Sequence, residues 1–204
     1  MFSAIRRAWK NYIDSIPKPI EFESVSDREI AKELNPPHSQ EIVDAYSELS
    51  NYIVAHLEGE IAVKTRAAIV RQLKPALEPA EALCDWISAR SGPQAKNLGL
   101  LAVDWKAREE INWQIQRIAK AHAVDLAWQY EWQSDESWQS ELRENEFPVE
   151  VPLKYAGNYF GKCGLSLIVI VQDDAVFGFA VSSAKEDRVR EICGKLSIRL
   201  SGDT

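Results

Sequence analysis

The chain has 204 residues, a net charge of −7 and a hydrophobic fraction of 46%. This is the composition of a globular protein that can bury a large core. The acidic balance argues against a general affinity for nucleic acid, because a phosphate-binding surface needs clustered lysine and arginine. The longest apolar run, 165–171, broken only by Ser166, falls far short of the roughly 20 residues of a transmembrane helix. The N-terminus lacks the pattern of a secretion signal, so we expect a cytoplasmic protein that does not contact membrane.

The first 90 residues have the apolar spacing of helices. The predicted helices of this half lie at 2–16, 42–57, 61–73 and 79–90. Ser91-Gly92-Pro93 then breaks the pattern, as expected of a boundary. We therefore divide the chain into a helical region, 1–93, and an α+β domain, 94–204, which can pack together as one unit.

The second half mixes strand and helix signals. In chain order we predict a strand at 98–103, a helix capped by Asp104, a strand at 126–132, a helix at 136–145, strands at 165–171 and 175–181, a helix at 184–193 and a strand at 196–200. The short connection Gln172-Asp173-Asp174 is typical of a hairpin. The segment 151–160 fits either a helical turn or irregular structure. The predicted fold class is α+β: an N-terminal helical region followed by a small mixed or antiparallel sheet flanked by helices.

Two stretches carry a family resemblance. LLAVDWKAREEINWQIQRIAKAH, with Asp104-Trp105-Lys106 and Trp113-Gln114, resembles a segment of an uncharacterised family of bacterial proteins of unknown function. LSLIVIVQDDAVFGFAV, followed by a helix and LSIRL, is similar to the C-terminal half of that family. The resemblance covers roughly residues 80–200 and implies no activity and no catalytic residue.

Motifs for familiar chemistry are incomplete in this sequence. The stretch AGNYFGKC, 156–163, lacks the first glycine and the Ser/Thr of a phosphate-binding loop and runs into a strand instead of opening a helix. Its glycines are expected to form a tight turn. The three histidines are isolated, and we expect His122 to bond a free carbonyl at the end of its helix. The sequence therefore predicts no cofactor and no metal site.

Three carboxylates form a possible polar site: Asp104, Asp173 and Asp174. They would converge if the strands that carry them end at the same place. Aspartate is also common in turns and at helix N-termini, so turn formation and capping explain the same residues.

The segment 125–150 concentrates acidic and aromatic residues. It holds eight acidic residues against Arg143 alone, interleaved with Trp128, Tyr130, Trp132, Trp138 and Phe147. Aromatic anchors within a field of like charge suit a protein interface for a basic partner, since the rings supply contact area and the carboxylates steer. Alternatively, strand alternation turns Trp128, Tyr130 and Trp132 toward the core and leaves the acids in water.

The leading hypothesis is a non-catalytic protein-binding module, for example an immunity protein, that holds a basic protein. The predicted partner-binding residues are Trp128, Trp132, Asp135, Glu136, Trp138 and Glu141. The alternative is a hydrolase with carboxylates at strand ends. A third interpretation is a platform on which exposed rings stack against sugars.

Overall fold

The computed structural model describes residues 37–93, 98–104, 110–128 and 149–202. The chain divides into two compact units, Met1–Pro37 and His38–Thr204, and the second unit is the one described below. Within the described ranges, no helix has both the length and the apolar character needed to cross a membrane.

Three helices open the described unit, as the apolar spacing predicts. They are α3 (Gln40–Ile53), α4 (Gly59–Val70) and α5 (Pro79–Ser91). Ser39 caps α3, because its hydroxyl accepts a hydrogen bond from the Ile42 N–H at 3.3 Å. Pro79 occupies the first turn of α5, where its missing N–H is harmless.

The strands form an antiparallel sheet in the order β1-β3-β2. These are β1 (Leu100–Asp104), β2 (Leu165–Gln172) and β3 (Ala175–Ser182). The predicted hairpin is confirmed: β2 and β3 pair from Leu165↔Ser182 to Gln172↔Ala175. Asp173 turns the chain with φ 49°, a conformation that aspartate tolerates better than most residues.

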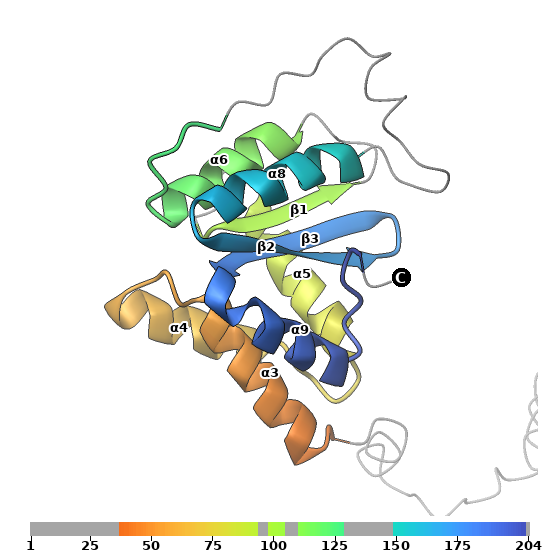
Figure 1. Ribbon diagram of the computed structural model, residues 1–204. Helices are drawn as coiled ribbons and strands as arrows, with labels where there is room; N and C mark the ends of the chain where they lie inside the picture. Colours follow the sequence, from red (N-terminus) through yellow and green to blue (C-terminus); the bar gives the residue numbers. More distant parts are fainter. Residues whose placement is uncertain (1–36, 94–97, 105–109, 129–148, 203–204) are drawn as a thin grey trace, which may run out of the picture. The chain divides into compact units, whose positions relative to one another are not determined.

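Helices cover both faces of the sheet (Figure 1). On one face lie α6 (Ile111–Ala121) and α8 (Glu150–Lys162), and on the other lie α3, α5 and α9 (Glu186–Lys195). Strand alternation explains this division. In β3, Phe177 and Phe179 belong to the core under α3 and α5, whereas Val176 and Ala180 belong to the core under α6 and α8. The predicted α+β class is confirmed.

The core under α3 and α5 joins the two predicted regions of the chain. Trp86 and Ile87 of α5 are buried together with Leu100 of β1 and Phe179 of β3. The expected boundary at 91–93 therefore lies inside one compact unit. The division into 1–93 and 94–204 stays a prediction, because most of the chain before His38 lies outside the described residues.

Two local predictions are wrong, and a third is not tested. The chain after α9 forms no strand at 196–200, because a turn at Ser197 (φ 54°) interrupts the extended pattern. Its backbone makes an isolated bridge between Leu200 and Ile170. The glycines of AGNYFGKC do not form a turn, since Gly157 and Gly161 lie inside α8. Asp104 ends β1 and α6 begins at Ile111; the capping role expected of Asp104 stays a prediction, because residues 105–109 lie outside the described residues.

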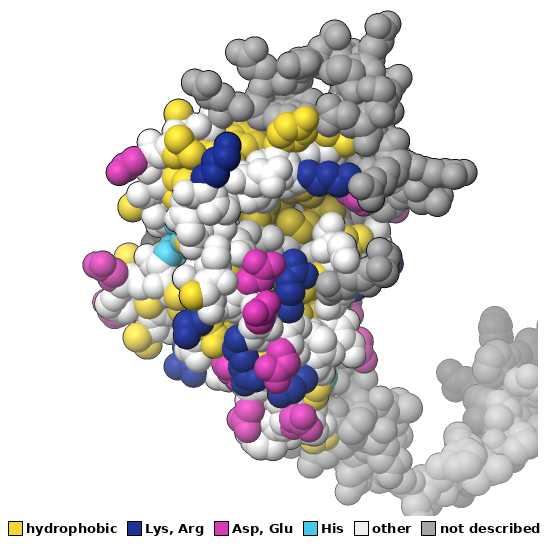
Figure 2. Space-filling view, in the orientation of Figure 1, with side chains coloured by type: hydrophobic (Ala, Val, Ile, Leu, Met, Phe, Trp, Pro, Cys, Tyr) yellow, Lys and Arg dark blue, Asp and Glu magenta, His cyan; other side chains and the backbone are white. Residues whose placement is uncertain are grey.

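The outer surfaces of α3 and α9 are joined by ion pairs. Arg188 donates to both carboxylate oxygens of Glu48, at 2.8 and 2.7 Å, and also to Glu191 at 2.7 Å. The hydrogen bonds from Arg188 lower the pKa of the Glu48 carboxyl. Figure 2 shows acidic and basic side chains interleaved over this region, so the described part of α3 and α9 is not a surface of one charge.

In the described part of the chain, β1 is an edge strand, and a side chain of α6 bonds to its backbone. Gln114 of α6 is 1% exposed. Its Oε1 accepts from the Ala102 N–H at 2.7 Å, and its Nε2 donates to the Ala102 C=O at 2.8 Å. The amide thus satisfies both backbone groups of Ala102 in the middle of this edge strand, which hinders pairing with another chain.

Arg117 extends this closure to the end of α5. Its Nη1 donates to the carbonyls of Ser91 at 2.9 Å and Gly92 at 2.8 Å. A guanidinium at a helix C-terminus satisfies free carbonyls and complements the helix dipole. Arg117 also lies 5.2 Å from the ring centroid of Trp113, so α6 joins the two helical layers past the edge of β1.

Candidate functional site

Only one of the six predicted partner-binding residues falls within the described part of the chain. Trp128 follows α6, whereas the other five lie in 129–148, outside the described residues: Trp132, Asp135, Glu136, Trp138 and Glu141. The strand predicted at 126–132 is wrong for residues 126–128, which are irregular. Side-chain contacts with α6 and α8, and not pairing with a described strand, hold these three residues.

Trp128 is half buried in a defined orientation. Its indole N–H donates to Oδ1 of Asn112 at 3.0 Å, and its ring meets Tyr159 edge-on, with centroids 5.2 Å apart at 70°. Tyr159 meets Phe160 of the same helix in a similar way, at 5.0 Å and 67°. Edge-to-face aromatic pairs add stabilisation beyond the area that they bury. Such a pair does not present two parallel ring faces, so it does not form a flat platform for sugars.

Tyr159 fastens the segment that leads to Trp128. Its hydroxyl donates to the carbonyl oxygen of Leu126 at 2.6 Å. Burial raises the pKa of the Tyr159 phenol, and the nearby Cys163 acts in the same direction. The phenol therefore remains a hydrogen-bond donor at neutral pH.

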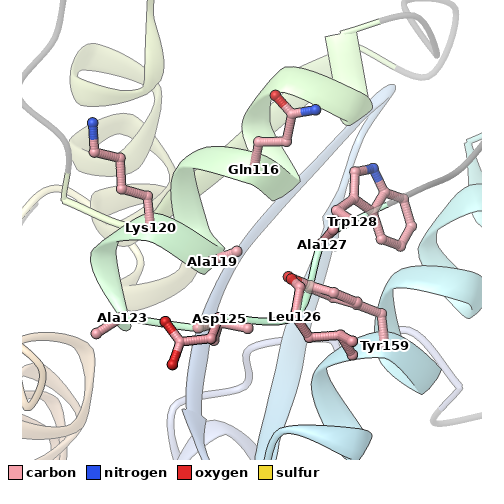
Figure 3. A pocket seen from close by; sticks show the side chains of 10 residues that line it. Gln116, Ala119, Lys120, Ala123, Asp125, Leu126, Ala127, Trp128 and Tyr159 are labelled. Carbon is pink, nitrogen blue, oxygen red and sulfur yellow. The ribbon is translucent and has the colours of Figure 1, made fainter.

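Two hollows flank residues 126–128. The first, with a volume of about 340 Å³, lies between this segment and α6; it is lined by Gln116, Ala119, Lys120, Ala123, Val124, Asp125, Leu126, Ala127, Trp128 and Tyr159 (Figure 3). In Figure 3, Trp128 and Tyr159 lie at one end of this hollow and Ala123 at the other. The second, about 430 Å³, faces α8 and is lined by Leu126, Ala127, Trp128, Tyr155, Asn158, Tyr159 and Lys162.

The surface between the hollows is partly apolar. Leu126 is 48% exposed and Tyr155 is 44% exposed, and the amide of Asn158 and the ammonium of Lys162 lie beside them. Exposed apolar groups rimmed by polar ones are typical of binding surfaces. The chemistry offered by these described residues is hydrophobic contact and hydrogen bonding.

The structure brings the three predicted aspartates to one end of the sheet. Asp104 ends β1 opposite Ala175, and Asp173 and Asp174 form the adjoining β2–β3 turn. Among the described residues, however, no group of three His, Cys, Asp or Glu side chains could hold a metal ion. The trio remains a polar cluster at a turn.

The cysteines are free in the structure. Burial is the main cause that raises the pKa of the Cys84 thiol to about 12, and Asp85 and Asp173 add to it. A nucleophilic cysteine needs a lowered pKa. Cys84 is therefore a core residue.

Sequence reasoning missed the residues that build the site around Trp128. Tyr155 and Tyr159 are spaced i, i+4 and therefore lie on one face of α8, but the glycines between and after them indicated a turn. Asn112 gave no signal, because it precedes Trp128 by 16 residues and only the fold brings the two together.

We expect Tyr159→Phe to lower the free energy of unfolding by about 1 kcal/mol, because it removes a short, partly buried hydrogen bond. Urea denaturation measures this loss. Tyr46→Phe is the matched control, since the buried Tyr46 hydroxyl has no hydrogen-bond partner among the described residues. Its removal should leave stability unchanged or raise it. Equal losses in the two variants would contradict the assigned role of Tyr159.

The fold and the site define an α+β domain with helices on both sides of an antiparallel sheet and a candidate binding surface at the end of α6. Residues 28–203 match the family described as "Domain of unknown function (DUF6630)", and the chain belongs to that family. This confirms the resemblance to an uncharacterised family and extends it toward the N-terminus beyond residue 80. No curated protein and no solved structure matches the chain significantly.

Proposed function

We propose that this chain is a non-catalytic, cytoplasmic protein-binding module that holds a basic protein partner. The observation that carries the proposal is the position of Trp128. This indole is held by Asn112 and Tyr159 between two hollows, and it stands near the beginning of the acid-rich segment 125–150. A pre-oriented tryptophan beside carboxylates is the combination found at the centre of many interfaces.

The acid-rich segment supplies the charge for such a partner. It contributes eight carboxylates against one arginine. Charges of this kind act mainly on the rate of association and on partner choice. A bacterial immunity protein, which occludes a basic toxin by shape and charge, is a concrete form of this function and needs no cofactor.

The alternative, a hydrolase, has one observation in its favour. Asp104 lies beside the turn formed by Asp173 and Asp174. A hydrolytic activity that Asp104→Asn abolishes and Trp128→Ala leaves intact would support this alternative over the binding module.

The binding proposal predicts loss of partner capture in two kinds of variant. The full chain is immobilised and incubated with extract of its native cell, and the captured proteins are identified and then titrated as purified proteins. We expect Trp128→Ala to weaken binding by about 30-fold, the effect of removing a central anchor of about 2 kcal/mol. The double variant Trp132→Ala, Glu136→Lys should weaken it further and reduce its dependence on salt.

Val63→Ala serves as the control, because this exposed residue of α4 lies outside the proposed surface. It should bind as the wild type does. Circular dichroism confirms that each variant is folded. Capture that is undiminished in the Trp128 and Trp132 variants, or that does not weaken at high salt, would contradict the proposal.

A further inference from the structure

Two histidines form a pair at the beginning of β1. His56 lies in the turn after α3, and His122 is the C-cap residue of α6. Their ring centroids are 4.2 Å apart with 32° between the planes. Since α3 and α6 cover opposite faces of the sheet, the pair joins the two helical layers.

Three of the four ring nitrogens of the pair make no hydrogen bond of good geometry among the described residues. These atoms are Nδ1 and Nε2 of His56 and Nε2 of His122. The hydrogen bond to a carbonyl that we expected for His122 is therefore not made by its Nε2. Gly99 fills the remaining space: a Cβ at this position would lie 3.3 Å from His56 Nε2 and 3.1 Å from Ala121 Cβ. A side chain at residue 99 would press on Ala121 and His56, in a backbone conformation (φ 64°) that side chains rarely adopt.

The surroundings of the pair favour neutral rings. Burial lowers the pKa of His122 to about 4, and His56 adds to this effect. Burial also lowers the pKa of His56, partly opposed by the Leu98 backbone. The charged residues within three positions of either histidine are Glu58, Lys120 and Asp125, and none of them is a cause of the lowered pKa of either ring. Lys96 precedes Leu98 but lies outside the described residues.

The end of α6 connects the pair to the first hollow. Ala123 follows His122 with φ 51°, and the Val124 N–H donates to the Ala119 carbonyl at 2.9 Å. This is the hydrogen bonding of a helix end closed by a left-handed residue. Because Ala123, Val124 and Asp125 line the hollow beside Trp128, movement of His122 displaces the wall of that hollow.

We propose that the stacked pair of His56 and His122 is an acid-sensitive latch between the two helical layers, which opens the end of α6 when either ring takes up a proton. Two positive charges cannot share this contact, and Nε2 of His122 has no hydrogen-bond acceptor within the described ranges. Each ring binds a proton more readily in the open form than in the closed form. The closed form is therefore fully stable above pH 6.5 and loses stability as the pH falls toward about 4.

Hydrogen exchange of the full chain between pH 7 and pH 5 tests the latch. Protection factors, which remove the pH dependence of the exchange chemistry, report the local opening equilibrium. For a ring whose pKa changes from about 4 when closed to 6.5 when open, opening should increase by about 20-fold over this interval. We expect this increase in 54–58 and 119–128, with the core of β3 unaffected.

The double variant His56→Phe, His122→Phe keeps an aromatic stack without a titrating group, and it should abolish the pH dependence of opening. His38→Phe is the control, because His38 lies outside the pair, with its Nε2 3.1 Å from the Lys74 oxygen. Titration of the imidazoles of the wild-type chain by NMR gives a second readout that requires no variant. A pKa at or above 6.5 for both paired rings, or the same pH dependence in the double phenylalanine variant, would overturn the proposal.

Discussion

Gln114→Met should lower the free energy of unfolding by about 2–4 kcal/mol, because the thioether fills the same space but leaves the N–H and C=O of Ala102 without partners. Gln114 is 1% exposed, and its amide makes both hydrogen bonds at 2.7 and 2.8 Å. A buried backbone group left unpaired costs more than an ordinary hydrogen bond gains. Urea denaturation, with unchanged slope and a lower midpoint, measures this loss.

The control is Gln116→Met, two residues away on the same helix and exposed, which should change stability by no more than about 0.5 kcal/mol. The Gln114 variant should also associate with itself at high concentration, since an unprotected edge strand is a template for another chain. Sedimentation measures this association. A Gln114→Met protein as stable and as monodisperse as the Gln116→Met protein would show that the edge of β1 does not depend on the amide.

Gly178→Ala should destabilise the protein by about 2–3 kcal/mol, the cost of overpacking a core that cannot relax. Gly178 lies in β3, the central strand, paired with Leu101 and Val169. A Cβ there would lie 2.6 Å from the backbone oxygen of Ile168 and 3.5 Å from Leu101 Cδ2. Because the closest atom belongs to the backbone of a paired strand, the methyl group cannot be accommodated by a side-chain rotation.

Gly157→Ala is the matched control for this substitution and should have the opposite sign. Gly157 lies inside α8, and nothing stands within 4 Å of a Cβ built on it. Alanine in a helix interior is favoured over glycine by about 0.5–1 kcal/mol. Thermal unfolding of both variants gives the comparison. A Gly178→Ala protein that unfolds at the wild-type temperature would mean that β2 and β3 can separate locally without cost.

The elements predicted with success are those whose signal is local. The β2–β3 hairpin combines two apolar runs with a two-aspartate turn, and the helices α3, α5 and α9 combine periodic apolar residues with caps or breakers. In each case the residues that identify the element lie within a few positions of one another. Backbone sterics and side-chain spacing then determine the conformation without reference to the rest of the chain.

Predictions failed where local signals conflicted with packing. Gly157 and Gly161 indicated a turn, yet α8 continues through them because Ala156, Tyr159 and Phe160 bury its apolar face against the sheet. The alternation after Leu126 indicated a strand, yet residues 126–128 are held by Tyr159 and Asn112 and pair with no strand in the described part of the chain. Tertiary contacts of this kind outweigh propensities of a few tenths of a kcal/mol per residue.

By itself, the sequence determined the α+β class, the hairpin and most helices, because these depend on neighbours along the chain. Only the tertiary structure decided which polar side chains matter and why. Gln114 reaches Ala102 across 12 residues, Tyr159 reaches Leu126 across 33, and His56 meets His122 across 66. Such pairs have no periodicity to reveal them, since hydrogen bonds and ring contacts between distant segments form only after the hydrophobic faces have set the helices on the sheet.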